Sequence, residues 1–425
     1  SFGRPYLPSY KMLDTYVCTF GYGSVTMDAA ADALWGRIPI NGLLPVDLNS
    51  KYSRGFGVPI KKRHNSWGQH LQIDFPDAWG VLDSAIKNKI FPGAQILIAK
   101  DGDIVFSGGF GHHTYDNGSP PVTTQSIYDI ASITKVLSIT PIIMKLISRN
   151  QISLDQPIYY FLPDFTGLNK ENVTIRHLLT HSSGIKSYHQ FFLEENSTDR
   201  EGILNDIISM DLEFQPGSQF SYSDLGMILL MDIAEMISRR SLNEMTKSWL
   251  FNPLNMTSTL YNPKKILLSQ IVPTEFDSLY RNRLVHGEVH DENTHLIGGV
   301  SSHAGLFSTA ENLSNYAQMY INNGTWLGKR IFKESMIREF TTRQYLPKDS
   351  DYALGWDTPS KNGKSSAGNY FSNTSFGHLG FTGTSMWIDP VEEIIIILFT
   401  NRVHPTRERE GIYGIRREFH NAVMA

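Results

Sequence analysis

The sequence predicts an α+β fold in which an antiparallel sheet is closed by strands from the two ends of one large domain. Residues 94–100 and 103–108 are apolar runs on either side of Asp101-Gly102, and this dipeptide is a strong signal for a hairpin turn. Residues 391–401 form another strand-like run near the end of the chain. Helical patterns occupy the sequence between these strands, which is typical of an α+β domain.

Two helices are predicted from apolar residues that recur at helical spacing. Residues 77–89 carry such residues every three or four positions and therefore form an amphipathic helix. A longer helix is expected to start at Ser132 and to continue through Ile147. Pro141 lies inside this second pattern, and it predicts a kink or a break there.

The composition is that of an ordinary globular protein. Hydrophobic residues make up 41% and charged residues 19% of the 425 positions, so a large core can form. The formal net charge is −4, from 38 basic and 42 acidic residues, and it offers no basic surface to nucleic acid. The longest apolar run, residues 394–399, is the length of a strand and far too short to span a bilayer. Cys18 is the only cysteine, so internal disulfides and thiolate zinc sites are excluded, and its apolar neighbours predict a buried structural role.

Residues 76–425 are expected to form the main domain, after a polar, glycine-containing linker at 51–75. Residues 1–50 contain an Ala-rich helix at 25–34 and then the run Gly42-Leu43-Leu44-Pro45-Val46. This stretch resembles the C-terminal edge of the second domain of family 3 glycoside hydrolases. The alternative is an N-terminal extension that packs on the main domain. Neither interpretation brings glycosidase chemistry, because that reaction needs two well-placed carboxylates and the family's nucleophile lies in an upstream domain.

The first candidate for chemistry is Ser132-Ile133-Thr134-Lys135, at the predicted start of a helix. A serine there lies near the positive end of the helix dipole, which favours a developing oxyanion. Lys135 shares the same helix face, and a buried neutral amine can take the serine proton. The pattern is weak by itself, since Ser84-Ala85-Ile86-Lys87 also fits it. That copy lies in the middle of a predicted helix, where Ser84 has no helix end to exploit, so Ser132 is preferred.

Two further segments single out Ser132. Residues 216–226 predict a turn, a short extended run and a helix start, so that Tyr222 can present its phenol to a cleft. A tyrosine needs cationic neighbours to act as a base, and Lys135 could supply them. The alternative is a packed Tyr222 with Asp224 as a helix N-cap. Residues 377–384 predict a glycine-rich edge strand that a substrate backbone can approach and whose free N–H groups can form half of an oxyanion hole.

Three elements in this order resemble the class C β-lactamase and D,D-peptidase superfamily, namely Ser132-x-x-Lys135, Tyr222-x-Asp224 and His378-Leu379-Gly380. Residues 173–185, 285–293 and 298–309 resemble further segments of these proteins. The resemblance covers residues 75–425 and implies a β-lactamase/transpeptidase-like fold, with helices flanking the sheet and an all-helical region. It implies no cofactor and no metal. Together with the glycosidase-like start, it suggests a β-N-acetylglucosaminidase–β-lactamase fusion of bacterial cell-wall metabolism that acts outside the cytoplasm.

By this resemblance Ser132 is acylated, and Lys135 and Tyr222 share the acid and base work. The backbone N–H groups of Ser132 and Phe381 form the oxyanion hole. The expected substrate is a D-amino-acid peptide derived from peptidoglycan, or a small ester, with weak β-lactam hydrolysis. A second hypothesis is a catalytically weak module that binds cell-wall fragments for a covalently fused upstream glycosidase. A third is a purely structural domain.

Two departures from the superfamily pattern bear on activity. Asp224 stands where the family has asparagine to orient the lysine and the substrate amide, and its charge favours a protonated Lys135. This favours Tyr222 as the base, or it lowers activity. His378 and Leu379 replace the usual lysine and hydroxyl residue, so a substrate carboxylate is expected to be held more weakly, because a histidine is mostly neutral at pH 7. Peptidase or esterase action is therefore favoured over efficient β-lactam hydrolysis.

Other catalytic classes are disfavoured. Hydrolytic zinc needs about three converging ligands, and the histidine-rich run is too interrupted by glycine to lie on one helix. No serine lies in a Gly-x-Ser-x-Gly motif, which disfavours an α/β-hydrolase. Residues 377–383 fit Gly-x-x-Gly-x-x-Gly but lead into a strand, so dinucleotide binding is rejected. The histidines considered as metal ligands are His286, His290, His295, His303, His177 and His181.

Overall fold

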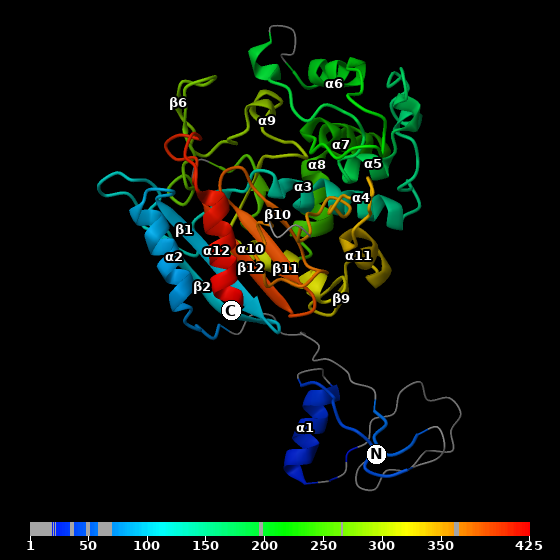
Figure 1. Ribbon diagram of the computed structural model, residues 1–425, viewed down its shortest axis with the longest axis vertical. Helices are drawn as coiled ribbons and strands as arrows, with labels where there is room; N and C mark the ends of the chain where they lie inside the picture. Colours follow the sequence, from blue (N-terminus) through cyan, green and yellow to red (C-terminus); the bar gives the residue numbers. More distant parts are fainter. Residues whose placement is uncertain are drawn as a thin grey trace. The chain divides into compact units, whose positions relative to one another are not determined.

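The computed structural model describes residues 19, 21, 23–34, 38–47, 52–57, 70–194, 199–264, 267–360 and 365–425. The chain divides into two compact units (Figure 1). One comprises Ser1–Trp67 with Leu327–Lys329, and the other comprises Gly68–Trp326 with Arg330–Ala425. The position of Cys18 lies outside the described residues, so its predicted burial stays a prediction.

The described part of the first unit contains a helix and a folded-back turn. Helix α1 (Ser24–Leu34) lies where the Ala-rich pattern predicts it. The Leu44 N–H donates to the Phe56 carbonyl, and the Gly55 N–H donates to the Leu44 carbonyl, each at 2.8 Å. The rings of Tyr52 and Phe56 meet edge to face with their centroids 5.0 Å apart. Residues 52–57 therefore fold back on the run that contains Leu44.

The second unit is built on a five-stranded sheet with the order β10-β11-β12-β1-β2 (Figure 1). Asp101 (φ 52°) and Gly102 (φ 82°) make the predicted hairpin turn in the left-handed conformation that such turns require. β12 pairs along its whole length with Ala94–Lys100 of β1 in antiparallel register, so strands from both ends of the domain close the sheet, as the sequence predicts. The bounds are β1 Gly93–Lys100, β2 Asp103–Gly111, β10 Phe376–Leu379, β11 Ser385–Asp389 and β12 Ile394–Thr400.

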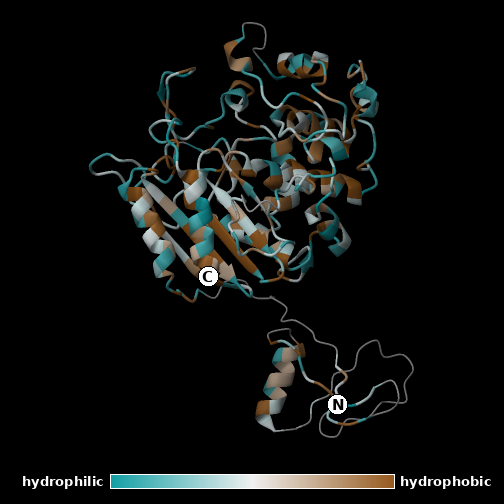
Figure 2. Ribbon diagram, viewed as in Figure 1, coloured by the Kyte–Doolittle hydropathy of each residue, from teal (hydrophilic) through white to brown (hydrophobic). Residues whose placement is uncertain are grey.

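Helices cover both faces of this sheet. α2 (Pro76–Lys87) and α12 (Ile412–Met424) lie side by side on one face (Figure 1), where they enclose Ile96 and Ile98 in an apolar cluster. The neighbouring residue of β1, Gln95, points to the opposite face and accepts the N–H of Ala310 at 2.7 Å. That alanine begins α10 (Ala310–Ile321), which covers the second face. The central strands are strongly hydrophobic (Figure 2), as expected of strands that are buried between two layers.

The remaining elements form a helical region beside the sheet (Figure 1). No helix in the described ranges is long and apolar enough to cross a membrane. The α-helices are α3 Ile133–Leu137, α4 Ile139–Ser148, α5 Ile175–Leu179, α6 Arg200–Ser209, α7 Asp224–Ser238, α8 Leu242–Thr246, α9 Glu292–Leu296 and α11 Glu334–Thr341. Short strands are β3 Tyr128–Asp129, β4 Leu260–Tyr261, β5 Phe276–Asp277, β6 Arg283–Leu284, β7 Leu306–Ser308, β8 Thr325–Trp326 and β9 Lys329–Arg330. Single turns of other helix types are η1 Ile158–Tyr160, η2 Lys170–Asn172, η3 Phe191–Leu193 and η4 Lys247–Phe251.

The single long helix predicted from Ser132 to Ile147 is wrong in one respect. The structure has two helices, α3 and α4, and the break falls at Ser138 (φ −115°, ψ −82°) rather than at Pro141. In a continuous helix the ring of Pro141 would clash with the carbonyl of Leu137. The break places Pro141 in the first turn of α4, where its missing N–H leaves no bond unmade.

Candidate active site

The predicted nucleophile lies at a strained turn between a strand and a helix. β3 ends at Asp129, and Ala131 then adopts a left-handed conformation (φ 45°) that non-glycine residues rarely take. Ser132 follows as the N-cap of α3, half-buried, with its side chain at a pocket. Among the described residues its backbone N–H has no hydrogen-bond acceptor, so it remains available at the helix N-terminus.

Lys135 is completely buried one turn behind the serine. Its Nζ donates to Ser132 Oγ at 2.9 Å and to the carbonyl of His303 at 2.9 Å. The same nitrogen lies 2.7 Å from Asp224 Oδ1 and 4.9 Å from the centroid of the Tyr222 ring. A buried ammonium group needs such partners, because burial without them would neutralise it.

The charges around Lys135 act in opposite directions on its protonation. Burial disfavours its charged form, but the Asp224 carboxylate, followed by Tyr222, outweighs this, and the pKa of Lys135 is raised above its usual value. Burial also raises the pKa of the Tyr222 phenol, and the nearby Lys135 only partly opposes that. The resting site therefore holds a charged Lys135 and a neutral Tyr222.

Asp224 is not the helix cap that was weighed as an alternative for this position. Ser223 is the N-cap of α7, since its Oγ accepts the N–H of Gly226 at 3.0 Å. Asp224 is instead the first residue of the helix, where a carboxylate is favoured by the helix dipole. Its side chain does not cap the helix and instead pairs with Lys135 across the site.

The predicted glycine-rich edge strand is shorter than expected. Its first part is β10, which lies at one edge of the sheet and ends at Leu379, and residues 380–384 form the turn that leads into β11. His378 is buried, and its Nδ1 bonds the carbonyl of Leu379 at 2.8 Å. Burial, and next the charge of Lys135, lower the pKa of His378 to about 3, so the ring is neutral in the resting site. Any side chain at Gly380 would clash, because a Cβ there would lie 2.5 Å from the Ile130 carbonyl. This close approach brings the following residue, Phe381, next to the turn at residues 130–132, here called the nucleophile turn.

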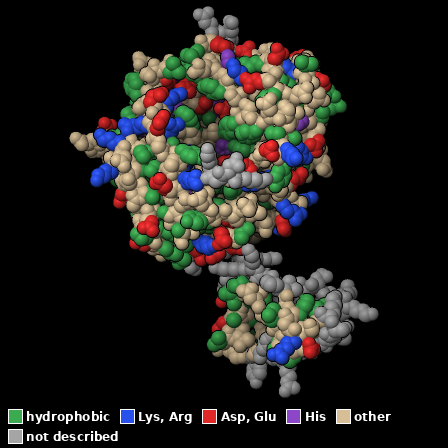
Figure 3. Space-filling model, viewed as in Figure 1, with side chains coloured by type: hydrophobic (Ala, Val, Ile, Leu, Met, Phe, Trp, Pro, Cys, Tyr) green, Lys and Arg blue, Asp and Glu red, His purple; other side chains and the backbone are tan. Residues whose placement is uncertain are grey.

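A cavity of about 380 Å³ joins these segments, and Figure 3 shows the face of this unit hollowed between the sheet and the helical region. Lys135 and Asp224 are not part of the lining. Lys135 is tied to it through Ser132, and Asp224 pairs with Lys135. The Phe381 N–H, like that of Ser132, has no acceptor among the described residues. The cavity is lined by Ser132, Tyr222, Tyr352, Asp357, His378, Leu379, Gly380, Phe381, Arg402, Ile412 and Arg416.

Comparison with known proteins decides the family. The family model described as Beta-lactamase matches residues 82–419. The chain belongs to the Beta-lactamase family. It is 31% identical over 364 residues to a Salmonella agona protein named provisionally as a D-alanyl-D-alanine carboxypeptidase, a match that covers 76% of this chain and 82% of the relative. It is 30% identical to the N-acetylmuramyl-L-alanine amidase of Bacillus subtilis, over 76% of this chain and 80% of that protein.

Solved structures confirm the Beta-lactamase-like fold. The octameric penicillin-binding protein homologue from Pyrococcus abyssi has 26% identity and a TM-score of 0.64, over 83% of this chain and 77% of that one. EstCE1, a hydrolase with promiscuous acyltransferase activity, has 19% identity and a TM-score of 0.66, over 82% of this chain and 98% of its own. The predicted α+β class, with a sheet, flanking helices and a helical region, is therefore confirmed.

Sequence analysis missed two arginines of this candidate site. Arg416 of α12 is buried, and its Nη2 donates to the carbonyls of Gly380 and Thr384, each at 2.7 Å. Arg402 follows β12, and its Nε donates to the Phe381 carbonyl at 2.9 Å. Neither arginine forms an ion pair with a carboxylate in the part of the chain that the structure describes. Isolated arginines give no sequence signal, so only the fold could reveal this pair.

Tyr352 and the packing of His181 on Tyr222 were also missed. The ring of His181 lies 4.4 Å from that of Tyr222 and 5.2 Å from that of Tyr352. Its Nδ1 accepts the Ser223 N–H at 3.1 Å, and burial lowers its pKa well below the usual value, so it is neutral. Sequence analysis weighed His181 as a metal ligand and, by the family resemblance, as a structural or cleft-lining residue. The structure shows it as the support on which the Tyr222 ring packs.

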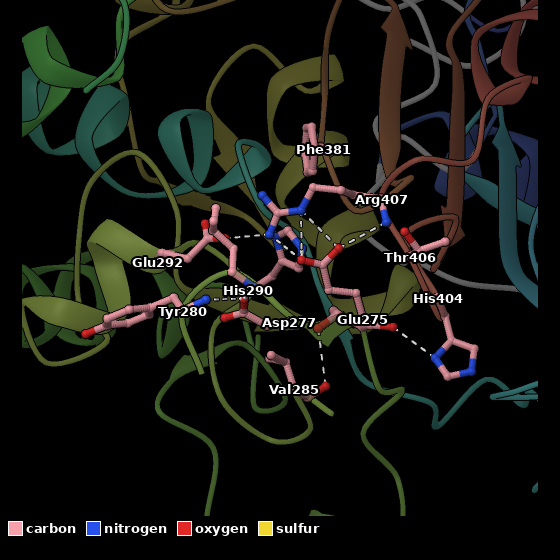
Figure 4. A network of polar contacts seen from close by, with 12 residues as sticks. Glu275, Asp277, Tyr280, Val285, His290, Glu292, Phe381, His404, Thr406 and Arg407 are labelled. Atoms are coloured by element: carbon pink, nitrogen blue, oxygen red, sulfur yellow. Dashed lines mark hydrogen bonds and ion pairs between the residues drawn. The ribbon is translucent and has the colours of Figure 1, made fainter. Parts of the chain in front are cut away.

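The histidines and carboxylates weighed for a metal have protein partners. His177 closes a capping box with Thr174, and His303 bonds Asp291 at 2.9 Å. Within the described ranges, one set of three carboxylates approaches within 4.8 Å, namely Glu275, Asp277 and Glu292. Arg407 pairs with Glu275 and Glu292 (Figure 4), and Arg281 pairs with Asp277. These charges are thus satisfied by guanidinium groups inside the protein.

Proposed function

We propose that this Beta-lactamase family protein is a serine hydrolase that forms an acyl-enzyme on Ser132. The observation that carries the proposal is the hydrogen bond of 2.9 Å between Lys135 Nζ and Ser132 Oγ, at the wall of an open cavity. The lysine is buried and the serine is half-buried, so the nucleophile faces the cavity while the ammonium group beside it is shielded from water.

The proposed reaction has two steps that use the same groups. Acylation starts from the form of the site in which Tyr222 is a phenolate paired with the charged Lys135. Ser132 Oγ attacks the substrate carbonyl carbon while its proton passes to the Tyr222 oxygen, and the bond to the leaving group breaks as that group takes this proton from Tyr222. In deacylation, water repeats the attack and returns the proton to Ser132. The Asp224 carboxylate favours the charged form of Lys135, which can in turn stabilise a Tyr222 phenolate as the proton acceptor. The N–H groups of Ser132 and Phe381 would bind the oxyanion in both steps.

The cavity supports a substrate with a negative charge near the scissile bond. Arg402 and Arg416 lie in its lining without carboxylate partners, and burial followed by the charge of Arg402 lowers the pKa of Arg416 only to about 9, which leaves it charged at neutral pH. These two cations offset the loss of carboxylate binding expected from neutral His378 and from Leu379. A peptide that ends in D-Ala-D-Ala carries its carboxylate one residue from the scissile amide. We therefore propose a D-amino-acid peptide of cell-wall origin as the substrate, with small esters as further acyl donors.

Two wider proposals go with this function. A peptidoglycan-derived substrate is met outside the cytoplasm, so we propose an extracytoplasmic, periplasmic location. The likeness of residues 1–50 to a glycoside hydrolase edge supports a covalently fused upstream glycosidase as a partner. The second candidate function is the catalytically weak cell-wall-binding module, and it is favoured by the tight pairing of Lys135 with Asp224 at 2.7 Å.

Covalent labelling separates the two candidate functions. The chain is incubated with a fluorescent penicillin or a fluorophosphonate, and its intact mass is measured. A hydrolase gains one adduct, which is lost in Ser132→Ala and retained in the matched variant Ser84→Ala. Absence of an adduct with both probes in the unmodified chain would contradict the proposal. For the substrate class, hydrolysis of an acyl-D-Ala-D-Ala peptide is compared with that of its C-terminal amide. A carboxylate held by charged hydrogen bonds predicts a kcat/KM about 10-fold or more higher for the free acid, and equal values would overturn the role of the arginines.

A further inference from the structure

We propose that Thr382, Asp129 and His290 are positioning residues that fix the distance between the two oxyanion-hole N–H groups. The inference rests on the proposed function, because it assigns a task to residues around the same site. The two N–H groups belong to Ser132 and Phe381, which are far apart in the sequence, so a direct link between their segments is needed to hold them together. The structure contains such a link, here called the oxyanion staple, formed by Thr382, Asp129 and His290.

The first part of the oxyanion staple joins the backbone of the two segments. Thr382 Oγ1 donates to the carbonyl of Asp129 at 2.7 Å, and Thr384 Oγ1 donates to the carbonyl of Ile130 at 3.1 Å. Thr382 has 1% and Thr384 has 0% of its surface exposed, so neither bond competes with water. Thr382 directly follows Phe381, and Asp129 lies three residues before Ser132. Each oxyanion donor is therefore within three residues of a buried hydrogen bond between the two segments.

The second part of the staple is the Asp129 carboxylate, which the catalytic proposal leaves without a task. It is 2% exposed, and its two oxygens accept the N–H of Ala131 at 2.8 Å and the N–H of His290 at 2.7 Å. Ala131 is the left-handed residue immediately before Ser132, and such strain persists only where the surroundings hold it. The carboxylate thus fixes the nucleophile turn to the backbone at His290.

The third part reaches the other donor through side chains. The His290 ring packs against the Phe381 ring, with their centroids 5.6 Å apart, and its Nε2 lies 3.3 Å from Glu275. Arg407 pairs with Glu275 and extends below Phe381, as Figure 4 shows. Arg402 stacks on the same phenyl ring at 4.3 Å and donates to the Phe381 carbonyl, which orients that peptide. His290 therefore contacts both halves of the oxyanion hole, one through its N–H and the other through its ring.

This arrangement gives a task to a segment that sequence analysis singled out without one. Residues 285–293 resemble part of the carboxypeptidase pattern, and the structure places His290 of this segment between the two donors. Oxyanion stabilisation requires both N–H groups at hydrogen-bond distance from one oxygen, so a small displacement of either group weakens catalysis. Within this arrangement the contact with the oxyanion is made by Ser132 and Phe381. The staple residues act only by positioning these two.

Thr382 offers a matched pair of variants for the test. Thr382→Val keeps the shape but removes the bond to Asp129, whereas Thr382→Ser keeps the hydroxyl. With a p-nitrophenyl ester we expect Thr382→Val to lose about 10- to 100-fold in kcat while KM changes less than about threefold, because the lost contact acts in the transition state. Thr382→Ser is expected to keep most of the activity. The control is Arg283→Ala, which breaks an exposed ion pair with Glu288, two residues before His290. This variant is expected to leave the rates unchanged.

A second measurement separates positioning from loss of folding. A thionoester places sulfur, a larger and poorer acceptor, in the oxyanion hole, so the ratio of ester to thionoester rates reports on its geometry. This ratio is expected to fall in Thr382→Val and to stay unchanged in Thr382→Ser and Arg283→Ala. If Thr382→Val does not fold, the same ratio is measured for His290→Phe. This variant keeps an aromatic ring and the backbone N–H at position 290 but loses the contact with Glu275. An unchanged kcat and ratio in the folded variants overturns the staple, while a lack of acylation of Ser132 in the unmodified chain overturns the proposed function itself.

Discussion

Two copies of one four-residue pattern lie in this chain, and their surroundings differ in every respect that matters for chemistry. Ser84 and Lys87 lie on the exposed side of α2, and Ser84 Oγ accepts a bond from the Asn88 side chain at 3.3 Å. Ser132 instead caps α3 at a strained turn, and Lys135 behind it has no exposed surface. A serine and a lysine three residues apart are thus common, and the helix end and the burial make one pair different from the other.

The same comparison shows how charge is controlled at the two lysines. Lys87 is surrounded by water, so its charge is screened. Lys135 has lost that water, and the neighbouring Asp224 and Tyr222 decide its protonation instead. Residues that are distant in sequence can therefore control the charge of the lysine in the copy at Ser132, but not in the copy at Ser84.

The largest effect is expected from replacing the two lysines in turn. Lys135→Met removes the cation that stabilises the Tyr222 phenolate and is expected to lower kcat/KM for a p-nitrophenyl ester by about 10²- to 10⁴-fold. Lys87→Met, on the exposed face of α2, is expected to leave the rate unchanged and to alter the free energy of unfolding by less than about 0.5 kcal/mol. Steady-state kinetics and thermal unfolding measure both. Similar losses in the two variants would show that burial does not distinguish the two copies.

A smaller effect is expected from the charge next to Lys135. Asp224→Asn restores the residue of the superfamily pattern and removes a carboxylate that raises the pKa of Lys135 and also that of Tyr222. The pKa of the proton acceptor therefore falls, and the acidic limb of the kcat/KM profile moves to lower pH whichever of the two groups it reports. A displacement of one pH unit would raise the rate on that limb about 10-fold. A limb that stays in place or moves to higher pH would contradict the assigned role of Asp224.

The smallest effect is expected from titration of His378. Its pKa is lowered to about 3 by burial and by Lys135, so it stays neutral from pH 5 to pH 8. The ratio of the His378→Gln rate to the unmodified rate is expected to change less than about twofold across this range. The unfolded chain takes up a proton near pH 6.5 and the folded chain only near pH 3, so acid below about pH 6.5 destabilises the unmodified fold. Urea unfolding at several pH values should show a smaller loss of stability in acid for His378→Gln than for the unmodified chain. A ratio of the two rates that follows a titration near pH 6.5 would refute the neutral ring.

Much of the fold could be predicted because it rests on local signals. The Asp101-Gly102 turn fixes the hairpin, and the apolar run that forms β12 is long enough to recognise as its partner. The predicted break at Pro141 lies three residues after the observed break between α3 and α4. The sequence shows the proline, but it does not show where the helix must end so that the Leu137 carbonyl avoids the proline ring. Of the predicted site residues, the structure brings Ser132, Lys135, Tyr222 and the β10 residues together around one cavity.

The sequence by itself determined the residue types and local shapes of this site: a serine at a helix start, a lysine one turn on, and a glycine-rich edge strand. Only the tertiary structure decided which Ser-x-x-Lys pair is buried, which arginines face the cavity, and what holds the oxyanion donors in place. The physical reason is separation along the chain. The bond from Thr382 to Asp129 spans 253 positions, and its worth depends on burial that no local pattern encodes.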